Sequence, residues 1–514
     1  MATQQTLTPA WLGATYHEHQ EDGIRWMLKC ENSGFPIPET KIVVRGGMLG
    51  DKMGVGKTIQ SMGLIANGEA QKTLVVTPLA VRGQWESELR RANVDLYLPT
   101  QWGGKWVLQG SSVATPGRKI VHLAHYDKVA NRSDLCQGEA YDRIILDEAH
   151  TIRNAATKKA QSILKIAALV KYKWALTGTP VTNSMDDCST YLKFLGFPVS
   201  PGKKWLPAYE EWARNTYMSR RLTECPIGNT GLVIPPTPIE ETRLLDFTSA
   251  DEETLYTSIH ANEESKWRDA KALKGSNYQL AMFAILLRLR QVSVNPQIYI
   301  KARQKERLGW VGPEFHSVSR KFDEIIGLMR ESKEAGESHK WIIFCQFHEE
   351  MVLLDAYLRA HEFVDQVLQY HGGMSMKERE AALKEAKVAP ASGKQDAFLI
   401  QLKAGSTGLN LQQYDRIIFV SPWWTPSEME QAKARAVRIG QQKVVRIYML
   451  HLKTEEKFNI DKFMMDKVFA KKELADNFER WSAHLSPEYS GQEDVQEGVQ
   501  EDVQDVKEPH INLL

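Results

Sequence analysis

The segment GGMLGDKMGVGKT, residues 46–58, contains the residue types that bind phosphate. A glycine-rich turn that opens a helix directs backbone N–H groups at a phosphate, and the helix dipole adds to the attraction. Gly54 and Gly56 would let the backbone approach closely, and Lys57 would reach the β- and γ-phosphates. Asp51 stands where the general pattern has its first glycine, so a turn without a ligand is the alternative. We predict a nucleotide site made by Asp51, Met53, Gly54, Val55, Gly56, Lys57 and Thr58, with Thr58 as a ligand of Mg²⁺.

A second group of reactive residues follows the apolar run RIIL, in the sequence RIILDEAH at 143–150. A carboxylate at the end of a buried strand is costly unless it meets a cation. Asp147 would hold Mg²⁺ through water, and Glu148 would orient and polarise the attacking water. Such a sequence could also be a helix cap, but the upstream glycine-rich loop favours hydrolysis of a nucleoside triphosphate. Lys57, Asp147 and Glu148 are the predicted catalytic residues of this half of the chain.

The elements that must position these residues follow an alternating pattern. Over 1–196, short β-branched runs such as TLVVTP and YKWALTGTP alternate with helical segments, which indicates a parallel sheet of βαβ units. Over 197–318 the pattern changes to long helical periodicity with a break at IPPTP, which predicts a helical insertion and linker. The βαβ rhythm resumes over 319–484, and the acidic repeat EDVQEGVQEDVQDV within 485–514 predicts a disordered tail.

Composition limits the classes of protein that the chain can belong to. Its 514 residues exceed one ordinary domain, and 42 % hydrophobic and 25 % charged residues are typical of a soluble globular protein. No apolar run is long enough to span a bilayer, and the first residues lack the basic and apolar regions of a secretory leader, so we expect neither membrane insertion nor secretion. The cysteines, scattered as Cys30, Cys136, Cys188, Cys225 and Cys345, favour a reducing compartment over a disulfide framework or a zinc ribbon.

The net charge of +1 hides an uneven distribution. From Pro487 onward eight carboxylates face Lys507 alone, which gives the tail −7 and leaves +8 on the rest of the chain. A basic body permits nucleic-acid binding without demonstrating it.

With these motifs in place, the chain resembles the Swi/Snf-like DNA translocases of helicase superfamily two. The resemblance runs from about His19 to Met449, interrupted by the helical insertion, and its most specific parts are TGLNLQ, the tandem Trp423-Trp424 and RIGQ. The other matching segments are HQEDGIRWML, GGMLGDKMGVGKTIQ, LVVTPLAVRGQWESEL, ILDEAHTIRN, ALTGTPVTNS, LRLRQVSVNP, KWIIFCQF, HGGMS, SPWWTP and EQAKARAVRIGQQ. The sequence departs from the family pattern at His19, Lys52, Ala434 and Val437, none of which removes a group expected to touch phosphate.

This resemblance implies a fold of two RecA-like parallel-sheet lobes that close on one nucleotide. Gln20 would read the adenine edge, and Gly408 and Asn410 would contact the nucleotide from the second lobe. Arg435 and Arg438 would be the arginines that stabilise charge on the γ-phosphate, a contribution of roughly 10³ to 10⁵ in rate. Their spacing of three would place both on one helix face.

Contacts to DNA would go to phosphates through loops that follow strand ends, because a translocase must ignore base sequence. Simple helix caps are the alternative for these loops, and a core position is the alternative for the tryptophan. The candidates are Thr77, Pro78, Arg82, Thr177, Gly178, Thr179, Gln346, His371, Gly372, Ser406, Thr407 and Trp424.

We expect an ATP- and Mg²⁺-dependent motor on double-stranded DNA that displaces or remodels bound protein. A strand-separating DNA or RNA helicase and a catalytically silent nucleotide-binding scaffold are the alternatives. Nucleosomes, partner proteins that bind the acidic tail or the helical insertion, and a nuclear location are further expectations from the resemblance.

Overall fold

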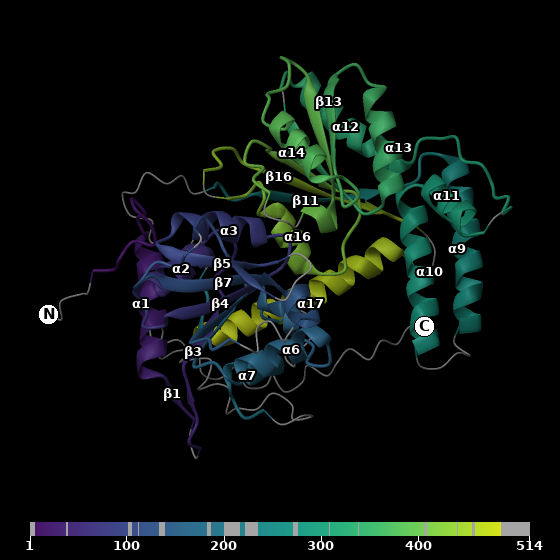
Figure 1. The fold of residues 1–514 in the computed structure, drawn as a ribbon. Coiled ribbons are helices and arrows are strands. Elements are labelled where there is room, and N and C mark those ends of the chain that lie inside the picture. The colour runs from purple at the N-terminus through teal and green to yellow at the C-terminus, as the bar shows by residue number, and fades with distance from the viewer. Residues whose placement is uncertain are drawn as a thin grey trace. The chain divides into compact units, whose positions relative to one another are not determined.

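The chain divides into two compact units, one formed by Met1–Arg221 with Leu474–Leu514 and the other by Leu222–Glu473. The structure is a computed structural model (Figure 1). The structure describes residues 6–37, 40–100, 105–111, 113–132, 139–181, 187–199, 216–220, 235–270, 276–307, 309–337, 339–405, 409–438, 440–454 and 458–484.

The first unit is built on an eight-stranded sheet in the order β10-β3-β9-β8-β4-β7-β5-β6. Neighbouring strands are parallel except for β6, which runs antiparallel to β5. The strands are β3 (Gly46–Leu49), β4 (Lys72–Thr77), β5 (Val94–Pro99), β6 (Trp106–Leu108), β7 (Lys119–His125), β8 (Arg143–Asp147), β9 (Tyr172–Leu176) and β10 (Tyr217–Met218). A separate antiparallel pair joins β1 (Phe35–Pro36) to β2 (Val43–Val44).

Alternation along the strands divides the core of the first unit into two layers. Ile144 and Leu146 of β8 pack with helices on one face, whereas Ile145 packs on the other, as expected for a strand that is buried on both sides. The first face is covered by α4 (Tyr126–Asn131), α6 (Lys158–Ala167) and α7 (Asp187–Leu195), with the short 3₁₀ turn η1 (Ala149–Ile152). The second is covered by α1 (Glu18–Ser33), α2 (Lys57–Asn67) and α3 (Arg82–Arg91) (Figure 1).

The second unit contains a six-stranded, all-parallel sheet in the order β11-β16-β15-β12-β14-β13. Ile343 and Ile342 of β12 point to opposite faces and belong to separate core clusters. The strands are β11 (Ile239–Leu245), β12 (Lys340–Cys345), β13 (Val364–Tyr370), β14 (Gln395–Gln401), β15 (Arg416–Phe419) and β16 (Arg446–Leu452).

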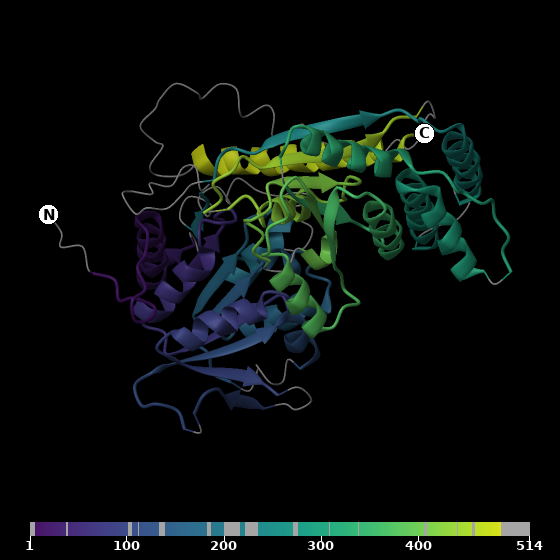
Figure 2. The same cartoon turned by 90° about the horizontal axis from the view of Figure 1, so that it is seen from above.

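Helices cover both faces of this second sheet. The teal helices α9, α10 and α11 lie together in both views (Figure 2). The helices are α9 (Ala250–Ala270), α10 (Ser276–Val294), α11 (Pro296–Glu306), α12 (Arg320–Glu334), α13 (His348–Arg359), α14 (Met376–Glu385), α15 (Leu402–Gly405), α16 (Pro426–Lys433) and α17 (Ile460–His484).

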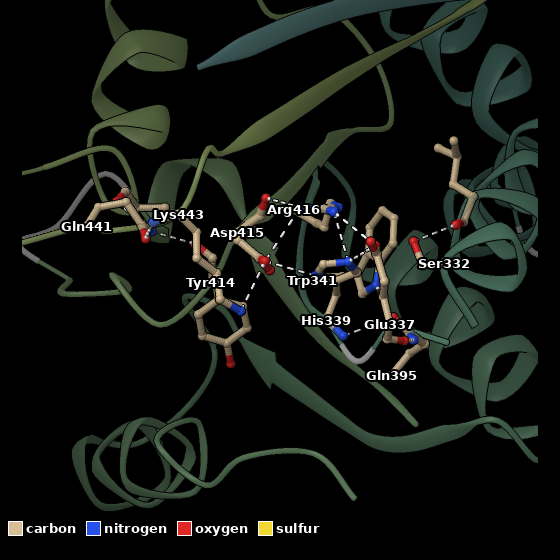
Figure 3. Close-up of polar contacts among 12 residues, drawn as sticks. Ser332, Glu337, His339, Trp341, Gln395, Tyr414, Asp415, Arg416, Gln441 and Lys443 are labelled. Atoms are coloured by element: carbon tan, nitrogen blue, oxygen red, sulfur yellow. Dashed lines mark hydrogen bonds and ion pairs between the residues drawn. The ribbon is translucent and has the colours of Figure 1, made fainter. Parts of the chain in front are cut away.

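A cluster of polar residues at the amino edge of the second sheet connects the starts of neighbouring strands. Asp415, directly before β15, lies 2.8 Å from the Nδ1 atom of His339, which precedes β12 (Figure 3). The opposite ring nitrogen lies 2.6 Å from Glu337, and Lys443 lies 3.4 Å from the Asp415 carboxylate. The Arg416 guanidinium lies 3.5 Å from the same Asp415 carboxylate (Figure 3).

The predicted α/β class with two parallel sheets is confirmed. The segment 197–318, predicted as helical, also contains two strands, because β10 joins the first sheet and β11 joins the second. Both strands lie at a sheet edge, where β10 is only two residues long and β11 carries the polar sequence IEETRLL. Neither therefore has the apolar alternation of a central strand. Within the described ranges, no helix combines the length and apolarity needed to cross a bilayer.

Candidate nucleotide-binding and hydrolysis site

The glycine-rich loop connects the end of β3 to the start of α2. Gly54 and Gly56 have φ values of 91° and 102°, a left-handed region in which a side chain would be strained. Gly56 is the N-cap of α2, so the first N–H groups of the helix follow directly after the loop. The Lys57 ammonium donates to the main-chain oxygen of Asp51 at 2.6 Å. The loop therefore presents a cation and a helix N-terminus together, which is the arrangement that binds phosphate.

The start of α1 packs against the back of this loop. The oxygen of Val55 lies 3.0 Å from the Nε2 atom of His19 and accepts a 3.3 Å hydrogen bond from the Gln20 amide. The other end of that amide accepts from the main-chain N–H of His17 at 3.1 Å. A β-carbon on Gly56 would lie 2.6 Å from the Gln20 amide nitrogen, so only glycine fits there. The structure thus brings Gln20 to the loop, and adenine recognition stays a prediction.

Asp147, the last residue of β8, is buried beside Glu148. Burial, followed by the charge of Glu148, raises the pKa of Asp147 to about 6, although a hydrogen bond from Trp85 and the charge of Lys57 act to lower it. The Trp85 indole of α3 donates to the Asp147 carboxylate at 2.7 Å, and the Tyr126 hydroxyl donates to its main-chain oxygen at 2.8 Å. Asp147 is therefore an oriented carboxylate that lacks a full counter-charge.

Glu148 has a strained backbone. Its φ of 48° and ψ of 55° make it the one non-glycine residue with positive φ in the part of the chain that the structure describes. Its carboxylate lies 3.2 Å from the His150 ring, which in turn lies 3.3 Å from the Thr177 hydroxyl. Strain of this kind persists only where the surroundings over-determine it, and it is concentrated at functional sites.

The loop that follows β9 completes the site. The Lys52 ammonium donates to the Gly178 oxygen at 3.0 Å, and a β-carbon on Gly178 would lie 3.6 Å from the Lys57 ammonium nitrogen. Strands β3, β9 and β8 are neighbours in a parallel sheet, so the loops after them meet at one edge. Ligands of open α/β sheets bind outside this carboxyl edge.

The residues at this edge fit a magnesium nucleotide. A buried carboxylate with a raised pKa, a lysine and a helix N-terminus lie together, and each would gain from a bound ion of opposite charge. Thr58 is the second residue of α2 and lies beside Lys57 in sequence. Thr58 and Asp147 would hold Mg²⁺, which when bound would supply positive charge against the negative charge that develops on the phosphates. Asp51, also predicted at the nucleotide site, differs from these residues because its carboxylate is fully buried and faces away from solvent.

The predicted DNA contacts of the first unit differ in their exposure, and all of them stay predictions. Thr77 and Thr177 have no exposed surface, because each ends or follows a strand that is buried on both faces. Gly178 is also buried, against the glycine-rich loop. Pro78, Arg82 and Thr179 are partly exposed, and Arg82 is the first residue of α3.

In the second unit, the structure corrects the prediction that the two arginines lie on one helix. Arg435 and Arg438 do not share a helix face, because α16 ends at Lys433 and both arginines lie in the turns beyond it. The Arg435 oxygen accepts from the Leu411 N–H at 3.0 Å, and the Gln441 amide donates to the Ala436 oxygen at 3.4 Å. The carbonyl oxygens of Arg435 and Ala436 therefore accept hydrogen bonds from residues outside α16. Burial lowers the pKa of Arg438.

The remaining candidates of the second unit have mixed surroundings. The Gln346 amide donates to the Pro422 oxygen at 3.0 Å, and Trp424 lies with its ring centroid 5.1 Å from the guanidinium of buried Arg290. Gly372 is exposed and donates to the Gln401 amide at 3.2 Å. His371 is half-buried and Asn410 is exposed, whereas Ser406, Thr407 and Gly408 lie outside the described residues.

Sequence reasoning missed three residues that hold the site together. Trp85 and Tyr126 position Asp147, and Arg220 pairs with Asp51. Trp85 lies in the segment GQWESEL that was matched to the family, but nothing in that segment indicates an indole directed at the carboxylate.

Comparison with known proteins gave two family matches. The SNF2-related domain matches residues 19–298, and the helicase conserved C-terminal domain matches residues 320–440. The "Probable global transactivator" of Orgyia pseudotsugata multicapsid polyhedrosis virus is 29 % identical over 461 residues, which are 87 % of this chain and 88 % of the viral protein. YwqA of Bacillus subtilis, named for an inferred ATP-dependent helicase or translocase activity, is 26 % identical over 94 % of this chain and 51 % of its own length. The solved structure titled "Sulfolobus solfataricus SWI2/SNF2 ATPase core in complex with dsDNA" is 22 % identical, with 94 % of this chain and 98 % of that chain covered and a TM-score of 0.37.

Proposed function

The chain belongs to the SNF2 family of helicase-type ATPases, and from this premise we propose that it moves along double-stranded DNA by hydrolysing ATP. The movement displaces or remodels protein bound to the DNA. The chain spans about half the length of the Bacillus subtilis relative and 40 % of a related Arabidopsis thaliana protein, so the activity of those larger proteins comes to this chain only as part of the proposal.

One observation carries the proposal: the glycine-rich loop, Asp147 and Glu148 meet at the carboxyl edge of a single parallel sheet. Lys57 lies close enough to Asp147 to lower the pKa of that carboxyl group. Lys57 then binds the outer phosphates, Asp147 holds the hydrated cation, and Glu148 orients the attacking water.

Other roles in the proposal rest on sequence alone. Gln20 reads the adenine, and Thr58 is a direct ligand of Mg²⁺. Arg435 and Arg438 stabilise charge on the γ-phosphate, with Gly408 and Asn410 as further nucleotide contacts.

The substrate is double-stranded DNA, bound through its phosphates by Pro78, Arg82, Thr179 and the candidate residues of the second unit. Within the proposal, nucleosomes are a further substrate, and partner proteins bind through the acidic tail or the helical insertion. The matched relatives come from a bacterium and a virus as well as from plants, so a nuclear location stays a prediction.

The central test measures ATP hydrolysis with no nucleic acid, single-stranded DNA, double-stranded DNA, RNA and nucleosomes side by side. We expect the largest stimulation with double-stranded DNA. Glu148→Gln is the matched variant, because it keeps the shape of the side chain and removes the charge that polarises water. Equal rates for this variant and the wild type, or no hydrolysis by the wild type, would contradict the proposal.

A strand-separating helicase is the second candidate, favoured by relatives named as DNA helicases. A translocase on duplex DNA displaces the third strand of a triplex without opening the duplex, whereas a helicase separates a forked duplex. Displacement of the triplex strand together with an intact fork supports the first candidate, and the reverse result supports the second.

A further inference from the structure

Residues 218–220 of the first unit run along the glycine-rich loop. In addition to the pairing of β10 with β3, the Gly50 N–H donates to the Met218 oxygen at 2.6 Å and the Lys52 N–H donates to the Arg220 oxygen at 2.9 Å. The Ser219 hydroxyl donates to the Gly50 oxygen at 3.1 Å. Residues 218–220 therefore form a strap on residues 50–52, although the two segments lie almost 170 positions apart.

Arg220 directs its guanidinium from this strap into the base of the loop. Its Nε and Nη2 atoms donate to the two oxygens of Asp51 at 3.1 Å and 2.6 Å. Nη2 also donates to the Gln60 amide oxygen at 2.8 Å, and Nη1 donates to the main-chain oxygen of His19. One side chain thus joins the glycine-rich loop, the first helical turns after it and the start of α1.

The Asp51 carboxylate depends on this pairing. It has no exposed surface, and it pairs with Arg220 and accepts a hydrogen bond from the Gln60 amide at 3.0 Å. Removing one partner of a buried ion pair leaves an uncompensated charge, which is strongly destabilising at that position. The main-chain oxygen of the same Asp51 accepts the hydrogen bond from Lys57. The position of Lys57 is therefore linked to Arg220 through a single residue.

Gly23 of α1 shows how closely these groups pack. A β-carbon at this position would lie 1.8 Å from the Gln60 amide oxygen and 2.7 Å from the Nη2 atom of Arg220. Glycine at this position therefore leaves room for the Nη2 atom of Arg220 and the Gln60 amide to meet where they do.

We propose that Arg220 is a positioning residue of the nucleotide site, which acts through Asp51 to hold the glycine-rich loop and Lys57 in the conformation that binds phosphate. This inference rests on the proposed function, since it assumes that the loop binds a nucleotide. Arg220 does not touch the substrate. Its effect is on nucleotide affinity and on the Michaelis constant for ATP.

The first unit contains a matched control, the buried pair of Arg143 and Glu31. Arg143 donates to both carboxylate oxygens at 2.6 Å, and both side chains are almost fully buried. This pair lies near the C-cap of α2, because a β-carbon on the C-cap residue Gly68 would lie 2.3 Å from the Arg143 guanidinium. The Arg220 pair lies at the opposite end of the same helix. A general loss of packing should therefore affect the two pairs alike, whereas a positioning role belongs to Arg220 alone.

The test compares Arg220→Lys, Arg220→Gln and Asp51→Asn with Arg143→Lys and the wild type, all as the full chain. Binding of a fluorescent ADP analogue, the Michaelis constant and kcat for ATP, and the melting temperature are measured for each. We expect Arg220→Gln and Asp51→Asn to weaken binding and raise the Michaelis constant by roughly 10- to 100-fold, the effect of misplacing a catalytic group. Arg220→Lys should recover part of the loss, because it keeps the charge but not the two-point geometry.

Arg143→Lys should lower the melting temperature without changing the Michaelis constant, since unfolding reduces the number of active molecules and not their affinity. Folded Arg220 variants with wild-type affinity and Michaelis constant would overturn the inference. If Arg220→Gln does not fold, Arg220→Lys decides by the same measurements. Failure of the wild type to bind the analogue would instead contradict the proposed function.

Discussion

Single residues at the candidate site are held in conformations and environments that cost stability. Asp147 is buried next to a second carboxylate, and Glu148 has a left-handed backbone. Neither feature improves the packing of the sheet. Both are explained if the first unit is organised to bind a cation and a phosphate chain, which supply the missing charges.

Replacing Asp147 by Asn should stabilise the free protein and abolish ATP hydrolysis. The folded pKa of about 6 lies above the ordinary value, so this group costs stability as the pH rises from about 4 to 6, and the full cost applies above pH 6. We expect Asp147→Asn to raise the melting temperature at pH 8, without Mg²⁺ or nucleotide, by about 2–4 °C for each kcal/mol recovered. The difference should vanish near pH 4. A lower melting temperature at pH 8 would show that the carboxylate is already compensated.

Replacing Glu148 by Gln should separate binding from hydrolysis. The amide keeps the size of the side chain but cannot polarise water, so we expect kcat to fall by about 10²- to 10⁴-fold. Binding of a fluorescent ADP analogue should be unchanged, which provides the internal control. A large loss of affinity instead would assign Glu148 to nucleotide binding.

At the scale of elements, the carboxyl edge of the first sheet and the amino edge of the second carry different kinds of polar residues. The carboxyl edge of the first sheet gathers the reactive residues, whereas the amino edge of the second gathers the ion pairs around Asp415 (Figure 3). Burial alone would raise the pKa of Asp415, but the hydrogen bond with His339 and the charges of His339, Arg416 and Lys443 outweigh it and hold the pKa below its usual range. We infer that this cluster fixes strand ends and has no part in catalysis.

Replacing Asp415 by Asn should therefore lower stability without altering the Michaelis constant for ATP. A depressed carboxyl pKa contributes stability above the unfolded value, and this contribution is lost as the pH falls through the folded value. We expect a loss of about 1–3 kcal/mol at pH 7 in urea unfolding, with a smaller difference from the wild type below about pH 4. Asp355→Asn, which removes a surface pair with Arg359, should cost under about 1 kcal/mol. Equal losses for the two variants would contradict the assignment.

At the scale of the whole molecule, the proposed function requires a surface that binds the DNA backbone. Arg82 is the first residue of α3 and is partly exposed at the carboxyl edge of the first sheet, whereas Arg90 in the last turn of the same helix bonds to Glu86. The two arginines thus offer a comparison within one helix, one at the expected DNA surface and one at a surface ion pair.

We expect Arg82→Ala to weaken DNA binding equally for unrelated sequences and to reduce the salt dependence of binding by about one counterion. Arg90→Ala should change neither. Fluorescence anisotropy with two duplexes of different sequence, measured over a salt series, checks both expectations. A loss confined to one sequence would indicate recognition of bases and contradict a sequence-blind motor.

The sequence by itself determined the family and the two α/β halves, whereas the roles of the reactive residues stay predictions. The phosphate loop and the DEAH segment carry their chemistry in residue types at fixed short spacings, and central strands are recognisable because both of their faces must be apolar. Arg435 and Arg438 show where local patterns fail. The segment AKARAV has helical composition, but α16 ends at Lys433, and the carbonyls of Arg435 and Ala436 accept from the distant Leu411 N–H and from the nearby Gln441 amide.

Only the tertiary structure decided which side chains support the reactive ones. Arg220, Trp85 and Tyr126 reach Asp51 and Asp147 from elements far away in the sequence, and the strands β10 and β11 are too short or too polar to be recognised before their partners are known. The physical reason is that a buried carboxylate needs a donor within about 3 Å, and any polar residue that the fold brings there can supply it. Local sequence patterns identify the carboxylate that needs a partner, whereas tertiary packing determines which residue becomes that partner.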